Sequence, residues 1–284
     1  MLRRWGIGPK QTGKIAAAIV WMAAILTLLL LAFILVYVLW NGLPQLSLSF
    51  LFGNPTNMGR SGGIWPMIVS TAFLSVLSVL IATPVGVATA IYLTEYTREG
   101  RLTRIIRFGT EALAGIPSII FGLFGFVFFV IYLGLGWSVL SGALTLSIMI
   151  LPTIVRTAEE AILTVPRPYR EVSFSLGATR WQVVTTVVLP GALPGIVTGI
   201  ILGLGRTVGE TAAVILTAGS ALHMPHSLFS PARTMAVHFY ILAREGISDA
   251  NAWGTGAVLL ISILLINVLI NQAVQRLASR RMVR

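Results

Sequence analysis

The chain has 284 residues, of which 56% are hydrophobic and only 10% are charged, and its mean hydropathy is +0.90. Soluble domains carry about 25% charged residues, so this composition excludes an ordinary soluble domain. The absence of cysteine excludes disulfides, thiolate metal sites and cysteine nucleophiles. The net charge of +11 lies between hydrophobic runs rather than on one polar domain, which indicates membrane topology and not nucleic-acid binding.

Six apolar runs are long enough to cross a bilayer, which takes about 20 residues. We predict spans at about 15–40, 65–93, 112–133, 139–155 (with a polar extension to 165), 191–216 and 253–274. The first run is longer than a signal-peptide core and no small-residue cleavage site follows Trp40, so we expect it to be retained. Pro152 is expected to break the fourth span. The predicted fold class is an all-α integral membrane protein with six transmembrane helices.

The Lys and Arg residues alternate between the two sides of this topology. Most of them lie in the segments 1–14, 98–107, 156–180 and 276–284, whereas the opposite side carries only Arg60, Arg233 and Arg244. The positive-inside rule therefore predicts that both termini and the segment 166–190 are cytoplasmic. The expected location is the bacterial cytoplasmic membrane, with several passes.

The segment 166–190 reads as two short helices separated by a glycine. Pro168 suits a first helical position, Gly177 suits the left-handed residue that ends a helix, and Thr179 with Gln182 fits a capping box. The first helix is apolar on two sides. Such a helix packs inside its own chain, docks in the groove of a partner or lies on lipid.

Arg206 and Glu210 are charged residues inside the fifth apolar run. An ionised side chain near the bilayer centre costs about 2.5–3.5 kcal/mol, so both should face protein or a watery path. At a spacing of four residues, the two can form an internal ion pair that only neutralises their charges. Alternatively, Arg206 belongs to an anion path or gate, and Glu210 positions it or pairs across a subunit boundary.

Other polar residues give weaker signals. His223, His226 and His238 lie in the outer loop 217–251 at a spacing that matches no metal site. Arg233 and Arg244 in that loop either steer an anionic ligand or are ordinary loop charges. The run Gly8–Ile15 resembles a phosphate-binding Walker loop but lacks its final Ser/Thr, so we expect the chain itself to bind no ATP.

Glu171-Val172-Ser173, Gly177 and Val187-Val188-Leu189-Pro190 are similar, in type and spacing, to the cytoplasmic EAA loop of ABC importer permeases. Val172 and Ser173 replace the two alanines of that motif. The resemblance implies a type I ABC importer permease fold, in which this loop docks on a separate ATPase subunit. The residues that it assigns to this coupling are Arg170, Glu171, Phe174, Gly177, Leu189 and Pro190.

More specifically, the chain resembles the PstA-type permeases of bacterial phosphate importers. The resemblance rests on Gly115–Gly125 in the third span, Gly205–Ala212 in the fifth, and Ser227–Ser248 in the outer loop, although Ala213 stands where many members have proline. It covers about residues 62–272. We therefore divide the chain into residues 1–61 (first span and outer loop), a permease core at 62–275 with coupling loop 166–190, and a basic tail at 276–284.

The resemblance implies a transport subunit that is not an enzyme and works by alternating access. Its implied partners are a PstC-type permease, two PstB-type ATPase subunits that bind ATP and Mg²⁺, a PstS-type phosphate-binding protein, inorganic phosphate and membrane lipid. No cofactor is expected on the chain itself. Three alternatives remain at this stage: a permease for sulfate or molybdate, a secondary anion transporter that uses Arg206 and Glu210 without ATP, and a membrane scaffold.

Overall fold

A computed structural model describes residues 9–97 and 100–282 of the chain. The longer helices are α1 (Pro9–Gly42), α3 (Trp65–Ile91), α4 (Arg101–Ala114), α6 (Val139–Thr164), α9 (Leu189–Val208) and α12 (Asp249–Met282). The shorter ones are α2 (Leu48–Phe52), α5 (Ser118–Gly125), α7 (Arg167–Ser175), α8 (Arg180–Val183), α10 (Ala212–Thr217) and α11 (Met235–Arg244). Arg3, Arg4, Gly8, Arg98 and Arg284, which the sequence predictions use, lie outside the described residues.

Short irregular helical segments and one hairpin complete the fold. The 3-10 turns are η2 (Leu43–Gln45) and η3 (Asn57–Gly59), and the π-helical segments are η4 (Tyr92–Tyr96), η5 (Phe126–Tyr132) and η6 (Val184–Val188). Strands β1 (Pro55–Thr56) and β2 (Ser61–Gly62) pair antiparallel, with Pro55 opposite Gly62.

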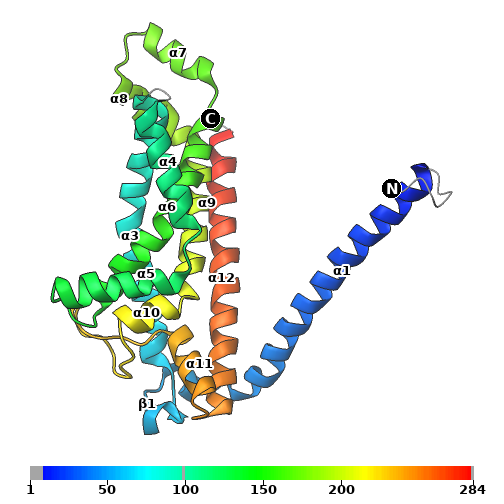
Figure 1. Ribbon diagram of the computed structural model, residues 1–284, viewed down its shortest axis with the longest axis vertical. Coiled ribbons are helices and arrows are strands. Elements are labelled where there is room, and N and C mark those ends of the chain that lie inside the picture. The colour runs from blue at the N-terminus through cyan, green and yellow to red at the C-terminus, as the bar shows by residue number, and fades with distance from the viewer. Residues whose placement is uncertain (1–8, 98–99, 283–284) are drawn as a thin grey trace.

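The helices α3, α4, α6, α9 and α12 stand upright in one bundle (Figure 1). Helix α7 caps one end of this bundle, which we call the α7 end, and β1 and α11 lie at the opposite α11 end. Helix α1 leans away from the bundle and joins it only at the α11 end. There, the rings of Tyr37 and Trp253 meet edge to face at 5.4 Å, and Gly42 lies against the backbone of Trp253.

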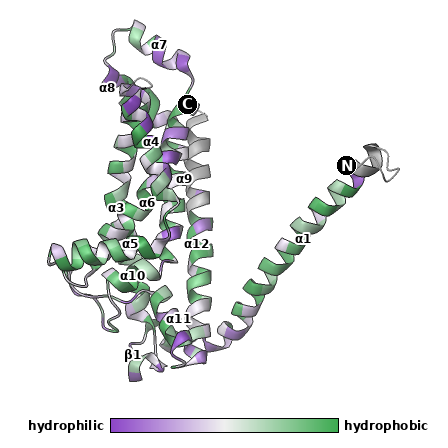
Figure 2. Ribbon diagram, in the orientation of Figure 1, coloured by the Kyte–Doolittle hydropathy of each residue, from purple (hydrophilic) through white to green (hydrophobic). Residues whose placement is uncertain are grey.

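Five described helical segments are long and apolar enough to cross a membrane, and a bent pair makes up to six. The five are Gly13–Gln45, Trp65–Tyr96, Val139–Thr164, Arg180–Val208 and Asp249–Leu269. None of the apolar stretch in the first segment is buried, so α1 is an apolar helix that is exposed along most of its length (Figure 2). The prediction of a multi-span helical protein is therefore confirmed.

The third predicted span, 112–133, is not one continuous helix. Helix α4 begins already at Arg101, and the segments Arg101–Ala114 and Ser118–Tyr132 are bent by 102° at the break between them. Gly115 and Pro117 lie in this break, and a residue before proline avoids the helical conformation. Because α4 begins at Arg101, the arginines at 101, 104 and 107 of the positive segment 98–107 lie on a helix.

The fourth and fifth predicted spans also need correction. Helix α6 continues through the buried Pro152 to Thr164, so the predicted break is wrong; membrane helices tolerate proline where neighbouring groups can bond the freed backbone. The fifth span begins earlier than predicted, at Arg180, and ends earlier, at Val208. The residues after Val208 form a break and the separate helix α10.

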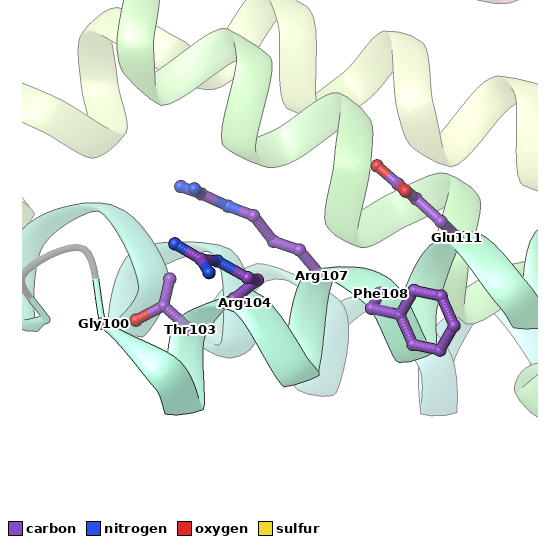
Figure 3. Close-up of a pocket in the computed structure, with 6 residues that line it drawn as sticks. All are labelled: Gly100, Thr103, Arg104, Arg107, Phe108 and Glu111. Carbon is purple, nitrogen blue, oxygen red and sulfur yellow. The ribbon is translucent and has the colours of Figure 1, made fainter.

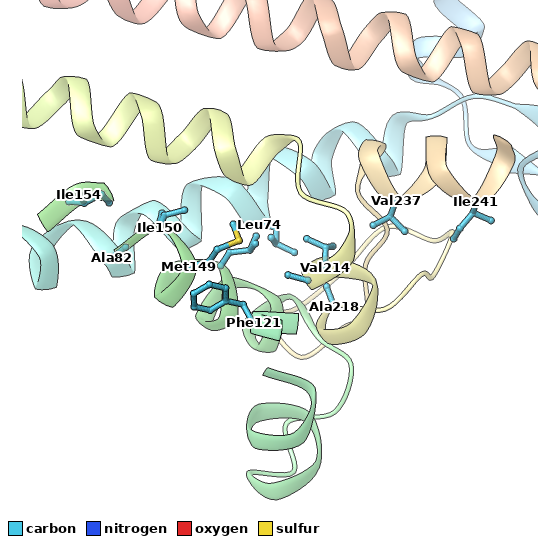
Figure 4. Close-up of a cluster of buried hydrophobic side chains, with 12 residues drawn as sticks. Leu74, Ala82, Phe121, Met149, Ile150, Ile154, Val214, Ala218, Val237 and Ile241 are labelled. Carbon is cyan, nitrogen blue, oxygen red and sulfur yellow. The ribbon is translucent and has the colours of Figure 1, made fainter. Parts of the chain in front are cut away.

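The central core lies where α3, α6, α5, α10 and α11 meet (Figure 4). Its fully buried side chains include Leu74 of α3, Leu146, Met149, Ile150 and Ile154 of α6, and Val214 of α10. A second cluster, nearer the α7 end, joins the end of α3 to α6, α8, η6 and α9 through residues such as Ile162, Val184 and Val188.

Helix α9 approaches α6 along a stripe of glycines. Gly191, Gly195, Gly199 and Gly203 recur every fourth residue and therefore share one face of the helix. A Cβ added to Gly195 would lie 2.5 Å from the Cβ of Ala161, and one added to Gly199 would lie 1.8 Å from Oγ1 of Thr157. The stripe fixes a close α6–α9 packing, as small residues do between membrane helices.

Candidate functional site

The segment 166–190 has the local structure predicted for it. Helix α7 starts with proline at its first turn, and Gly177 has φ +84° after its end. The Oγ1 of Thr179 accepts a hydrogen bond from Gln182 N at 3.3 Å, and Gln182 Oε1 accepts one from Thr179 N at 2.7 Å. The second short helix, α8, is continuous through η6 with the span that ends at Val208.

Helix α7 exposes large apolar side chains at the end of the bundle. Tyr169, Val172, Phe174 and Leu176 are 62%, 59%, 45% and 84% exposed, and Trp181 of α8 is 60% exposed. Polar and apolar residues alternate on this end, as Figure 2 shows. A helix with this much apolar surface gains stability by docking against another surface.

The residues that the sequence assigned to coupling do not all lie on this exposed face. Glu171 and Phe174 are exposed and line a cavity of about 350 Å³ beside Thr94 and Leu163, whereas Leu189 and Pro190 begin α9.

The side chain of Arg170 points toward the bundle and pairs with Glu95. It donates from Nε and Nη2 to Oε1 of Glu95, at 3.1 and 2.9 Å, and both side chains are about one-seventh exposed.

Arg170 also caps the end of α6. Its Nη2 donates to the carbonyl of Ile162 at 2.9 Å, and its Nη1 donates to the carbonyl of Val165. The last carbonyls of a helix lack intrahelical partners, so a guanidinium placed there satisfies them. The sequence reasoning missed Glu95, because 75 positions separate it from Arg170 and no local pattern relates the two.

Arg206 and Glu210 do not form the internal ion pair that their spacing allows. Among the described residues, the ion pairs join Arg107 to Glu159, Arg156 to Glu160 and Arg170 to Glu95. Helix α9 ends at Val208, so Glu210 lies in the break, where its Oε1 accepts a hydrogen bond from Ala213 N at 3.2 Å. Glu210 thereby caps α10, and the half-buried Arg206 makes no ion pair with a described residue.

Helices α5 and α10, which follow the breaks in the third and fifth spans, meet close to Glu210 in the sequence. A Cβ added to Gly122 of α5 would lie 2.8 Å from Cα of Ala213 and 3.2 Å from the carbonyl oxygen of Ala212. The glycine therefore allows α5 and α10 to touch through their backbones. The structure thus brings together the two sequence motifs Gly115–Gly125 and Gly205–Ala212, each of which contains a helix break or borders one.

At the α11 end, His238 is buried and the other two histidines are exposed. Arg233 is also buried; its Nε donates to the Ser220 carbonyl at 2.8 Å, and its Nη1 lies 3.4 Å from Nδ1 of His238. Burial, together with the Arg233 charge, lowers the pKa of His238 to about 4. Within the part of the chain that the structure describes, no group of three His, Cys, Asp or Glu side chains is placed to hold a metal.

Near the α7 end, a pocket of about 270 Å³ follows the surface of α4 (Figure 3). Arg104, Arg107, Phe108 and Glu111 line it. Arg107 donates to Oε1 of Glu159 in α6, with Nη2 at 2.7 Å and Nε at 2.9 Å. This ion pair fixes α4 to α6, so the positive charges of α4 serve in part to hold the bundle together.

A multi-span bundle with broken helices, a half-buried arginine and an exposed helix between two spans is typical of the membrane subunit of a transporter. The profile of the family described as "Binding-protein-dependent transport system inner membrane component" matches residues 82–283. The chain belongs to this family. It is therefore a multi-pass inner-membrane permease subunit of an ABC importer, not itself catalytic, whose partners include an ATPase and a substrate-binding protein.

Curated relatives and solved structures agree with this assignment. The chain is 36% identical to the probable ABC transporter permease protein YqgI of Bacillus subtilis, over 91% of this chain and 94% of that protein. It is 32% identical to the phosphate transport system permease protein PstA of Pasteurella multocida, over 91% and 93%. Its fold is similar to a chain of a bacterial alginate ABC transporter, with TM-score 0.69 and 17% identity over 92% and 94% of the two chains.

Proposed function

We propose that the chain is a PstA-type permease subunit that forms half of the pathway of an ATP-driven phosphate importer. The observation that carries the proposal is Arg206, a half-buried guanidinium beside a helix break with no ion-pair partner among the described residues. The similarity to PstA of Pasteurella multocida supports phosphate as the anion. Another oxyanion, sulfate or molybdate, is the alternative substrate.

Arginine suits this role for two physical reasons. Its charge is permanent and offsets part of the hydration that an oxyanion loses when it enters the pathway. Its planar guanidinium can donate two parallel hydrogen bonds to phosphate oxygens. Because Glu210 caps α10 instead of neutralising Arg206, the guanidinium remains available to a passing anion.

The proposed partners follow the same assignment. A PstC-type permease would complete the pathway, two PstB-type subunits would bind ATP and Mg²⁺, and a PstS-type protein would deliver phosphate; the chain itself would bind no cofactor. The exposed apolar side chains of α7 would dock on the ATPase. The α7 end and both termini would then be cytoplasmic, in agreement with the positive-inside rule.

The test is uptake of radiolabelled phosphate into vesicles that hold the chain with these partners. We expect uptake that requires ATP, is lost in Arg206→Gln and is retained in the control Arg101→Gln, which changes an exposed arginine of α4. Uptake of sulfate or molybdate in place of phosphate would contradict the substrate. ATP-dependent phosphate uptake that survives Arg206→Gln would contradict the role of Arg206.

A further inference from the structure

Arg170 and Glu95 are the charged contact between α7 and the inner bundle. Both side chains are mostly buried, at 14% and 13% exposure, and two guanidinium nitrogens share one carboxylate oxygen. Glu95 belongs to η4, the π-helical end of the span that begins at Trp65. This contact therefore joins α7 to the end of α3, across 75 positions of sequence.

The guanidinium of Arg170 also bonds the end of α6. Its donations to the carbonyls of Ile162 and Val165 attach the start of α7 to the end of α6. Arg170 thus makes four hydrogen bonds that reach two different spans. The two spans in turn pack on each other, since Leu74 and Ala82 of α3 share the central core with Ile150 and Ile154 of α6.

The remaining contacts of α7 are weaker in comparison. A cavity of about 740 Å³ separates one face of α7 from the start of α9, and Tyr169, Val172, Val187 and Gly191 line it. The large apolar side chains of α7, those of Tyr169, Val172 and Phe174, are all exposed. A displacement of α7 therefore reaches α3 through Arg170 and α6 through Arg170 and the connection 165–166, whereas it reaches α9 through the turn 176–179 and α8.

We propose that the Glu95–Arg170 ion pair is the rigid link that transmits movement of α7 to the α3–α6 pair during transport. The proposal rests on the proposed docking of the ATPase on α7. Arg170 and Glu95 are positioning residues: they line the same cavity as Phe174, but their side chains are mostly buried and bonded to each other. If the pair is broken, the ATPase still binds and hydrolyses ATP, but less of the movement reaches the spans.

The decisive variant is Glu95→Gln, which keeps the shape of the side chain and removes its charge. The matched control is Glu160→Gln, which removes the exposed i,i+4 ion pair with Arg156 near the same end of α6. In the reconstituted transporter, we would measure phosphate taken up per ATP hydrolysed. We expect this ratio to fall at least about fivefold in Glu95→Gln and to stay within about twofold of wild type in the control, as exposed pairs contribute little.

Two results separate this proposal from the docking on which it rests. Glu95→Gln should retain the ATPase subunit on copurification, whereas Phe174→Asp on the exposed face of α7 should lose it. If Phe174→Asp retains the ATPase, the docking face is wrong, and the link falls with it. If docking behaves as expected but the uptake ratio of Glu95→Gln equals that of wild type, the link alone is wrong.

A second measurement does not depend on the transported anion. Because the chain has no cysteine, single cysteines at the exposed Tyr96 and Leu176 can carry spin labels without a background signal. A rigid link predicts one narrow distance distribution between these sites, with and without ATP and vanadate. The same distribution should broaden in Glu95→Gln, and an unchanged width in that variant would overturn the proposal.

Discussion

Replacing Gly199 by alanine tests the close packing of α9 on α6. The new Cβ would lie 1.8 Å from Oγ1 and 2.8 Å from Cβ of Thr157, well inside van der Waals contact. Either Thr157 rotates or the two helices separate. Rotation removes the hydrogen bond from its hydroxyl to the Thr153 carbonyl, 2.8 Å long, so relief of the clash has its own cost.

The magnitude follows from comparison with a glycine on the same helix that has open space. Overpacking of a dense interior costs about 1–3 kcal/mol, while alanine in a helix interior gains about 1 kcal/mol over glycine. Gly205 has no atom within 4 Å of an added Cβ, so Gly205→Ala receives the gain without the clash. The difference between the two variants is therefore the overpacking cost alone, about 1–3 kcal/mol.

The assay is thermal unfolding of the purified chain in detergent, followed by loss of the monodisperse species. We expect Gly199→Ala to melt several degrees below Gly205→Ala. Thr157→Ala in the background of Gly199→Ala should restore part of the loss, because it removes the nearest atom but leaves a Cβ at 2.8 Å. Equal melting temperatures for the two glycine variants would refute the close α6–α9 contact.

Three further predictions concern His238, Gly177 and Glu210. Because the pKa of buried His238 is lowered to about 4, below the ordinary 6.5, the unfolded chain binds the extra proton first, and stability falls as the pH drops from about 6.5 towards 4. We expect melting curves to show a loss of about 2 kcal/mol between pH 7.5 and 5, and His238→Asn should remove that part of the dependence. Gly177→Ala meets no atom within 4 Å but strains the left-handed backbone at φ +84°, so we expect about 1 kcal/mol of destabilisation in thermal unfolding; a neutral result would mean that the turn relaxes. Glu210→Gln keeps an oxygen that accepts from Ala213 N, whereas Glu210→Ala loses the cap at about 1 kcal/mol, so identical melting temperatures for these two variants would contradict the capping role.

The features that the sequence predicts well are those that neighbouring residues determine. The capping box at Thr179 and Gln182 and the left-handed Gly177 depend on residues within a few positions, and both are present in the structure. The long apolar runs are also recognisable in the sequence. Each backbone group of a spanning helix must bond within its own helix, so every span is one continuous stretch of the chain. These short-range rules predict the multi-span fold class and the two helices of segment 166–190.

The features that the sequence does not predict depend on tertiary packing. Hydropathy alone does not show that the chain bends by 102° between Ala114 and Ser118, since the two segments taken together are long and apolar enough for one span. Pro152 shows the opposite error: a strong local signal for a break is overridden by burial inside the bundle. The glycine stripe of α9 was readable as a four-residue repeat, but its partners on α6 were not.

Two arginines hold the fold through carboxylates on other elements, whereas others, Arg206 and the buried Arg233 among them, make no ion pair with a described carboxylate. Arg107 and Arg170 bind carboxylates on other elements, Glu159 and Glu95, and thereby fix α4 and α7 to the inner bundle. Arg233 bonds the Ser220 carbonyl, whereas Arg206 is half-buried beside a helix break. Its nearest carboxylate in sequence, Glu210, is instead bound to the backbone of α10. This arrangement supports the proposed anion pathway, because a guanidinium already neutralised by its own chain would attract a passing oxyanion only weakly.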